Sequence, residues 1–157
     1  MPSTNSIQFN TTVNLSIEAA FKLFTENFSS WWPSEYSFSQ DVLHDIGMEL
    51  KADGLCYELG PHGFRCDWGR VLEYTPSTCL VLAWHLSPSS APDPNPAHAS
   101  EIQVNFVTEN AGSTRITVEH RHFDKHGEGW EAYLEEMASE YGWPYLLQCY
   151  SEAVGNQ

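Results

Sequence analysis

The stretch Ser113-Thr-Arg-Ile-Thr-Val-Glu-His-Arg-His122 decides the fold, because its side chains alternate in character. Successive side chains of an extended strand point to opposite faces. One face is then charged and polar, and the other carries Thr114, Ile116, Val118, His120 and His122. We therefore predict a strand with one buried face, which becomes polar at its two histidines, where we expect a pocket to open.

A helical pattern follows this strand. Large apolar side chains recur at spacings of three and four, which is typical of an amphipathic helix, at Trp130, Tyr133, Leu134, Met137 and Tyr141. Pro144 cannot donate a backbone hydrogen bond and disfavours helix just before it, so we predict a break at Gly142-Trp143. A second helix should begin around Pro144. Its side facing the sheet would carry Trp143, Leu146, Leu147 and Tyr150.

The residues before this stretch predict most of a sheet. Residues 6–15 alternate as a half-buried strand, and Ser16 is a candidate N-cap for a short helix that reaches Phe24. A further helical turn is predicted at 27–31. Five more strands are predicted around 46–50, 55–59, 66–74, 79–85 and 101–108, joined by turns that contain Gly or Pro. The expected fold class is α+β: a curved antiparallel sheet of six or seven strands, closed by a C-terminal helix, with two short helices after the first strand.

Length and composition favour one globular domain, residues 1–157, rich in aromatic side chains. Four prolines fall within residues 87–99, and we predict a flexible loop there. The loop is either a lid or a solvated bulge.

The charge balance argues against polyanionic partners. Seven Lys and Arg oppose 21 Asp and Glu, for a formal charge of -14, so nucleic acid and anionic membrane surfaces would be repelled. No C-x-x-C pair occurs among the four cysteines, which we expect to be free and buried. Without a signal-peptide pattern at residues 1–9 or a long apolar run, the chain is expected in the cytoplasm.

Aromatic and histidine side chains are the candidate pocket residues, with plain core packing as the alternative for each aromatic ring. The predicted ligand-binding residues are Trp31, Trp32, Met48, Tyr57, Trp68, Trp84, His120, His122, Trp143, Leu147 and Tyr150. Alternation predicts that the carboxylates of Glu58, Asp67 and Glu73 point outward.

Metal and nucleophile chemistry have weaker support in the sequence. The histidines and carboxylates of residues 119–126 are of the type that binds transition metals, but no third ligand is fixed by spacing, so we expect no metal. No nucleophile elbow and no Gly-rich phosphate loop occurs, and no cofactor is expected.

An ordered set of short motifs runs along nearly the whole chain. These are Ala20-Phe-Lys-Leu-Phe-Thr25, Trp31-Trp-Pro33, Gly69-Arg-Val-Leu-Glu73, Leu80-Val-Leu-Ala-Trp84, Thr114-Arg-Ile-Thr-Val-Glu-His-Arg121 and Gly142-Trp-Pro144. The set resembles bacterial homologues of the activator of heat-shock protein 90 ATPase, in the START-like (SRPBCC) superfamily. The resemblance implies a helix-grip fold with a deep, mostly hydrophobic cavity between the last helix and the sheet.

Three functions are compatible with this resemblance. We expect a binding domain that holds a small hydrophobic or aromatic molecule in the cavity. One alternative is a protein-interaction module like the chaperone activator. The other is a cyclase, dehydratase or hydrolase that uses His120, His122 or an inward carboxylate as acid or base, and we favour this enzymatic alternative less.

Overall fold

The strand predicted from residues 113–122 is β7 (Ser113–Arg121) in the computed structural model, which describes residues 5–89 and 91–155. Its inward side chains are buried as the alternation predicts: Thr114, Ile116, Val118 and His120 are each at most 1% exposed. The inward line ends there, because His122 has a left-handed backbone, with φ of 63°. The expectation that His122 continues this line is therefore wrong.

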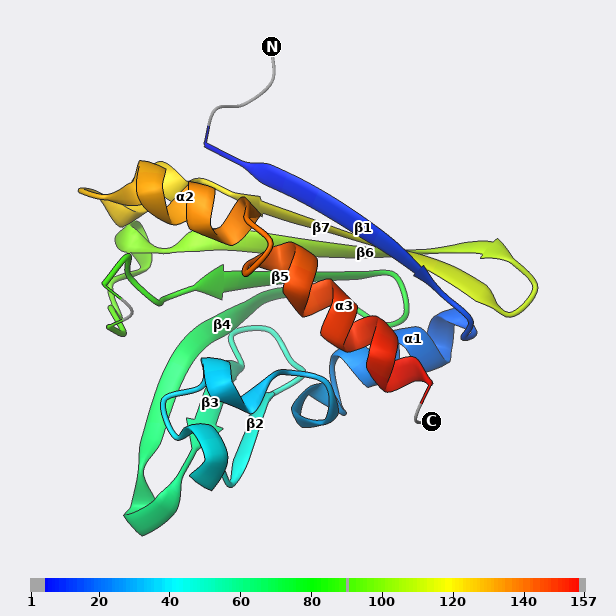
Figure 1. The fold of residues 1–157 in the computed structure, drawn as a ribbon, viewed down its shortest axis with the longest axis horizontal. Coiled ribbons are helices and arrows are strands. Elements are labelled where there is room, and N and C mark those ends of the chain that lie inside the picture. The colour runs from blue at the N-terminus through cyan, green and yellow to red at the C-terminus, as the bar shows by residue number, and fades with distance from the viewer. Residues whose placement is uncertain (1–4, 90, 156–157) are drawn as a thin grey trace.

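Six further strands complete one antiparallel sheet in the order β1-β7-β6-β5-β4-β3-β2 (Figure 1). They are β1 (Ile7–Val13), β2 (Asp45–Met48), β3 (Leu55–Leu59), β4 (Arg65–Thr75), β5 (Cys79–Trp84) and β6 (Ser100–Asn110). Neighbours from β2 to β7 are joined as successive hairpins, and β1 adds to the free edge of β7. The seven strands and their order along the chain agree with the α+β prediction.

The sheet is strongly curved, and β4 is the strand that bends most visibly (Figure 1). The pairing register shifts between Cys56 and Tyr57, where β3 meets β4, and between Val71 and Glu73, where β4 meets β5. Such bulges bend a strand and increase its twist. The two irregularities therefore lie on both edges of the bent strand and produce the hollow that the helices fill.

Three α-helices cover the concave face: α1 (Ile17–Phe24), α2 (Trp130–Ala138) and α3 (Trp143–Val154). Ser16 caps α1 as predicted, since its hydroxyl accepts from the Ala19 amide at 3.2 Å. The second predicted turn is the 3-10 helix η1 (Phe28–Ser30). None of the helices in the described residues has the length and apolar content needed to cross a membrane.

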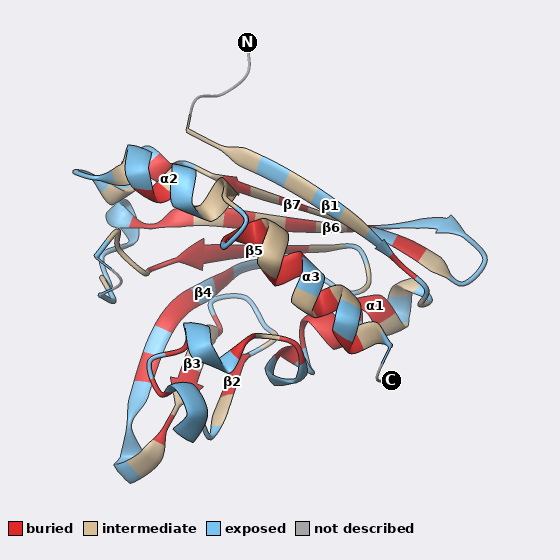
Figure 2. Ribbon diagram, viewed as in Figure 1, coloured by how far each residue is buried: buried red, intermediate tan, exposed pale blue. Residues whose placement is uncertain are grey.

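Helix α3 crosses the hollow of the sheet, and its buried side faces the strands (Figures 1 and 2). Its four predicted inward residues, Trp143, Leu146, Leu147 and Tyr150, are all buried. The Tyr150 hydroxyl donates to the Ala20 carbonyl at 2.7 Å, which joins the end of the chain to α1. The helix is thus held at several points along its length.

Helix α2 keeps its predicted apolar face except at Tyr141. Tyr133 is buried, and Trp130, Leu134 and Met137 are partly buried and pack against the core, whereas Tyr141 is 69% exposed. The reason is that the helix ends at Ala138, so the periodicity that placed Tyr141 on the same side no longer applies. Helix α2 therefore lies at the rim of the hollow.

The proline-rich segment and the cysteines are placed as follows. Within residues 87–99, of which Ser90 lies outside the described residues, Asp93 donates its amide to the His85 carbonyl at 2.7 Å and η5 (Pro96–His98) forms a 3-10 turn. Flexibility of this segment stays a prediction.

All four cysteines are free, but only Cys56 and Cys66 are buried.

We predict that Gly142→Ala destabilises the fold. A Cβ at this position would collide with the Met137 carbonyl oxygen, so the backbone between α2 and α3 must shift. We expect a loss of about 1–3 kcal/mol in the free energy of unfolding, measured by urea denaturation. Gly155→Ala is the matched control, because its nearest neighbour would lie at 3.5 Å. Equal stability of the two variants would contradict the prediction.

Candidate ligand pocket

Aromatic rings fill the centre of the hollow. Trp68 stacks on Phe28 with ring centroids 5.5 Å apart, and Trp31 meets Phe24 at 4.9 Å and Tyr150 at 5.5 Å. The space left among these rings is only about 10 Å³. A void this small holds at most one water molecule. The deep cavity implied by the family resemblance is thus packed shut.

His120 is part of a hydrogen-bonded chain in this core. The Trp143 indole, which can only donate, gives its Nε1 proton to His120 Nδ1 at 3.0 Å. His120 Nε2 therefore carries the ring proton and donates it to Ser100 Oγ at 2.7 Å. The Ser100 hydroxyl then donates to His126 Nε2, also at 2.7 Å. Both nitrogens of His120 are occupied, so this imidazole is a structural link between α3 and β7.

The chain requires neutral imidazoles. Burial lowers the pKa of His120 well below its ordinary value, and the nearby His126 lowers it further. Burial also lowers the pKa of His126 from 6.5 to about 4, although Asp93 acts in the opposite direction. Protonating His126 Nε2 would remove the acceptor that the Ser100 hydroxyl needs. The network is therefore complete near neutral pH and is broken in acid.

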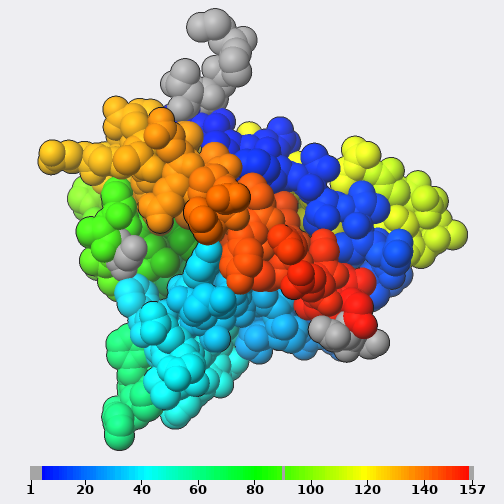
Figure 3. Space-filling view, in the orientation of Figure 1, coloured from blue at the N-terminus to red at the C-terminus, as the bar shows by residue number. Residues whose placement is uncertain are grey.

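A larger pocket opens at the mouth of the hollow, with a volume of about 390 Å³. Three segments meet there: residues 32–38, the end of β5 with Leu86, and residues 133–146. Figure 3 shows these cyan, green and orange parts of the chain coming together on the viewed face. The lining residues are Trp32, Glu35, Tyr36, Ser37, Phe38, Trp84, Leu86, Tyr133, Glu136, Met137, Tyr141, Gly142 and Leu146. We call this the mouth pocket.

Hydrogen bonds fix two walls of the mouth pocket. The Tyr133 hydroxyl accepts from Trp84 Nε1 at 2.6 Å and donates to the Leu86 carbonyl at 3.0 Å. The Tyr36 hydroxyl donates to the Tyr141 carbonyl at 2.8 Å. Trp32 Nε1 and Trp68 Nε1 differ from these groups, since both atoms are buried and neither has a hydrogen-bond partner within the described part of the chain. A buried donor of this kind is costly unless an acceptor meets it.

A buried carboxylate also holds the wall that carries Tyr36 and Phe38. Glu58 is 2% exposed, so the prediction that it points outward is wrong, whereas Asp67 and Glu73 are exposed as predicted. The Glu58 oxygens accept from the amides of Phe38 and Ser39 at 2.9 and 2.7 Å, and from the Ser39 hydroxyl at 2.7 Å. These donors replace the water that the carboxylate loses on burial. Glu58 therefore anchors the segment that carries Tyr36 and Phe38.

The predicted ligand-binding residues divide into three groups. Trp32 and Trp84 line the mouth pocket. Trp31, Met48, Trp68, His120, Trp143, Leu147 and Tyr150 lie in the core. Tyr57 and His122 lie on the outer face of the sheet, which corrects their placement. The Arg65 guanidinium lies 5.3 Å from the centroid of the Tyr57 ring. Tyr57 points outward because Cys56 and Glu58 take the inward positions of β3.

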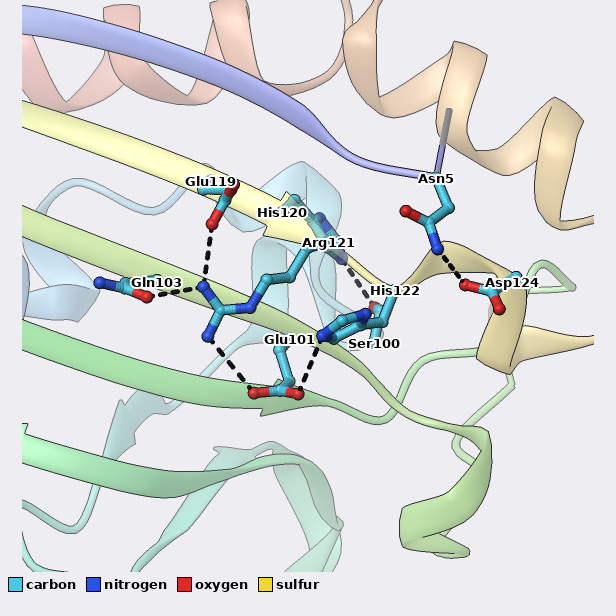
Figure 4. Close-up of polar contacts among 9 residues, drawn as sticks. All are labelled: Asn5, Ser100, Glu101, Gln103, Glu119, His120, Arg121, His122 and Asp124. Atoms are coloured by element: carbon cyan, nitrogen blue, oxygen red, sulfur yellow. Dashed lines mark hydrogen bonds and ion pairs between the residues drawn. The ribbon is translucent and has the colours of Figure 1, made fainter. Parts of the chain in front are cut away.

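The outer face around His122 is a charged network (Figure 4). The Arg121 guanidinium donates to Gln103 Oε1 at 2.6 Å and to Glu119 Oε1 at 2.9 Å. His122 Nε2 lies 3.6 Å from a Glu101 oxygen, and its side chain is 47% exposed. His122 is therefore a solvated partner of Glu101, away from the mouth pocket. Among residues 5–89 and 91–155, no three His, Cys, Asp or Glu side chains are grouped so that they could hold a metal ion.

Several pocket residues were not predicted from the sequence. Glu35, Tyr36 and Phe38 belong to residues 33–40, for which the sequence predicts no helix or strand. One signal is present in the sequence, since Tyr36 and Phe38 place two large aromatic side chains within a short polar loop, and grouped exposed apolar side chains mark interaction sites. Tyr141 and Phe38 remain 69% and 46% exposed at the rim of the pocket.

A curved antiparallel sheet gripped by a C-terminal helix defines a helix-grip domain of the START-like class. Residues 14–147 match the family described as "Activator of Hsp90 ATPase homolog 1-like protein", and the chain belongs to this family. Comparison with curated protein sequences gave no match.

Solved structures similar to this chain share its whole length. An anthrahydroquino-gamma-pyrone synthase complexed with SUM is 26% identical, with a TM-score of 0.67 and coverage of 98% of this chain and 99% of the synthase. The self-sacrificing resistance protein CalC from Micromonospora echinospora is 28% identical, with a TM-score of 0.66 and coverage of 98% and 96%. A protein from Nitrosomonas europaea, at 18% identity, a TM-score of 0.70 and coverage of 99% and 97%, supports the fold alone.

Replacing Glu58 with Gln should loosen the pocket wall at Phe38 and Ser39. Glutamine loses the charge and one acceptor oxygen, so at least one of the three donors to Glu58 is left weakly paired. We expect a loss of about 2 kcal/mol in stability and faster hydrogen exchange at the Phe38 and Ser39 amides. The exposed Glu73→Gln is the control. Unchanged exchange in Glu58→Gln would show that the carboxylate does not anchor this wall.

Acid should destabilise the protein through His126. Between pH 6.5 and about 4 the imidazole of residue 126 binds a proton in the unfolded chain but not in the folded protein. The stability that His126 contributes is therefore fully present above pH 6.5 and is lost as the pH falls toward 4. Urea denaturation should show a shallower pH dependence for His126→Gln, whose side-chain oxygen can still accept from Ser100. The difference stays below ~1.4 kcal/mol per pH unit, because His126 is only half buried.

His62→Asn serves as the control for this measurement, since His62 is exposed in a surface turn. Asparagine tolerates the left-handed backbone that His62 adopts. If His126→Gln and the wild type lose stability in parallel between pH 6.5 and 4, the histidine network does not set the acid limit.

Proposed function

We propose that this domain binds a small apolar molecule with an aromatic body in the mouth pocket. The observation that carries the proposal is a pocket of about 390 Å³ with aromatic walls beside a core that is otherwise filled. Small-molecule sites are of this size and combine apolar walls with a few polar groups. The proposed binding site thus lies at the rim of the hollow, where Trp32 and Trp84 line the pocket together with residues of α2.

A further observation concerns the polar groups beside the pocket. Among the described residues Trp32 Nε1 has no hydrogen-bond partner, but this atom is buried, so a ligand acceptor reaches it only if the side chain moves. One similar protein is a pyrone synthase complexed with SUM, and its similarity covers 98% of this chain, which supports a small-molecule site in the same fold.

Protein interaction is a second candidate function, because the rim of the same pocket exposes large apolar side chains. Tyr36, Phe38 and Tyr141 are 42, 46 and 69% exposed, and exposed apolar groups of this kind mark interaction surfaces. Acid-base catalysis by His120, His122 or an inward carboxylate has less support. His120 has both ring nitrogens occupied in the core, and His122 lies on the outer face. The inward carboxylate, Glu58, already accepts three hydrogen bonds from the pocket wall.

Calorimetry with 2-naphthylmethanol tests small-molecule binding, because this neutral alcohol combines a flat aromatic body with one acceptor. We expect saturable binding with one site, weakened about 10-fold or more in Trp32→Ala, which removes an aromatic wall of the pocket. Phe64→Ala is the control, as Phe64 is an aromatic residue that does not line the pocket and is 41% exposed.

The outcomes separate the two candidate functions. Binding that Phe64→Ala keeps and Trp32→Ala loses supports the small-molecule site. Failure of 2-naphthylmethanol and of related aromatic amines and acids to bind would overturn it. In that case the exposed rim becomes the better explanation for the aromatic residues.

A further inference from the structure

The charged groups of the mouth pocket are all of one sign. Glu35 on η2 (Ser34–Tyr36) and Glu136 on α2 line it from two different segments, and no Lys or Arg is among its lining residues. Neither carboxylate forms an ion pair with a cationic side chain of the described residues. Glu35 accepts one hydrogen bond, from the Tyr145 hydroxyl at 3.2 Å. Two uncompensated negative charges therefore border an apolar space.

The hydroxyl of Tyr36 experiences both carboxylates. Its pKa is raised first by burial and then by several negative groups, with Glu35 and Glu136 among them. Burial raises the pKa of Tyr133 to about 12, and Glu136 adds to this effect. These two tyrosines line the pocket from different segments, η2 and α2, so the negative groups act on both of these segments. The net charge of -14 on the whole chain has the same sign.

The aromatic walls favour the same kind of ligand as the carboxylates. The faces of Trp and Tyr rings carry partial negative charge and attract cations within about 6 Å. Trp32, Trp84, Tyr36 and Tyr141 all line the pocket. The hydroxyls of Tyr36 and Tyr133 already donate to backbone carbonyls, so the two carboxylates are the strongest acceptors left for a ligand.

We infer that the mouth pocket selects an organic cation, namely a protonated amine attached to an aromatic body. The inference rests on the proposed function and specifies the class of ligand for that site. The amine lies between Glu35 and Glu136 at the open side, and the aromatic body lies against Trp32 and Trp84. A neutral molecule of the same shape fills the same space without the charge interaction, and an anion is repelled.

Three naphthalene compounds of nearly equal size test the inference by calorimetry at pH 7: 2-naphthylmethylamine, 2-naphthylmethanol and 2-naphthoate. We expect the amine to bind about 10-fold more tightly than the alcohol, and the carboxylate to bind most weakly. Raising the salt concentration from about 20 to 500 mM should reduce the preference for the amine, because exposed charges are screened.

Matched variants identify the responsible carboxylates. Glu35→Gln and Glu136→Gln should each reduce the preference for the amine over the alcohol, and the double variant should abolish it while the alcohol binds as before. Glu131→Gln is the control, because Glu131 lies on the same helix, is exposed and does not line the pocket. It changes the net charge by the same amount as Glu136→Gln.

The results distinguish this inference from the proposed function. An amine preference that is lost in the double variant and kept in Glu131→Gln supports the cation site. Equal binding of amine and alcohol overturns the inference and leaves the aromatic pocket intact. A preference that Glu131→Gln reduces as much as Glu136→Gln also overturns it, since the effect then comes from net charge. Absence of binding by all three compounds overturns both proposals.

Discussion

The hydrogen bond from Trp143 Nε1 to His120 Nδ1 is the contact on which the arrangement of helix and sheet depends. It joins the start of α3 to the end of β7 where neither group reaches water. The bond sets the tautomer of His120, which sets the direction of the bonds to Ser100 and His126. A residue predicted to bind a ligand is thus part of the structure that holds the helix on the sheet.

The aromatic core determines where a ligand can bind. Members of a fold that grips a hollow with a helix are expected to leave the hollow open, but Phe24, Phe28, Trp31 and Trp68 occupy it here. Their rings interlock, so only about 10 Å³ of free space remains among them. The usable space is therefore displaced to the mouth, where α2 stops short and leaves about 390 Å³.

The wall at residues 34–38 is irregular backbone, and it needs an anchor because short 3-10 turns have little stability of their own. Glu58 supplies this anchor from the neighbouring strand by accepting two amide hydrogen bonds and one hydroxyl hydrogen bond. The same segment presents Tyr36, Phe38 and Glu35 to the pocket. The Glu58 carboxylate inside the sheet and the Glu35 carboxylate at the rim are thus connected through a few residues of chain.

Local patterns in the sequence determined the strands, the Ser16 cap, the break before Pro144 and the buried face of α3, because each follows from backbone geometry over a few residues. Only the tertiary structure decided that Glu58 points inward, that His122 and Tyr57 lie outside, and that most predicted pocket rings are core. The bulge at Cys56/Tyr57, the left-handed backbone of His122 and the end of α2 at Ala138 each change the direction of side chains. None of them alters the alternation or spacing of residues in the sequence. The mouth pocket joins three segments far apart in the chain, and their meeting depends on the curvature of the sheet, which no local pattern encodes.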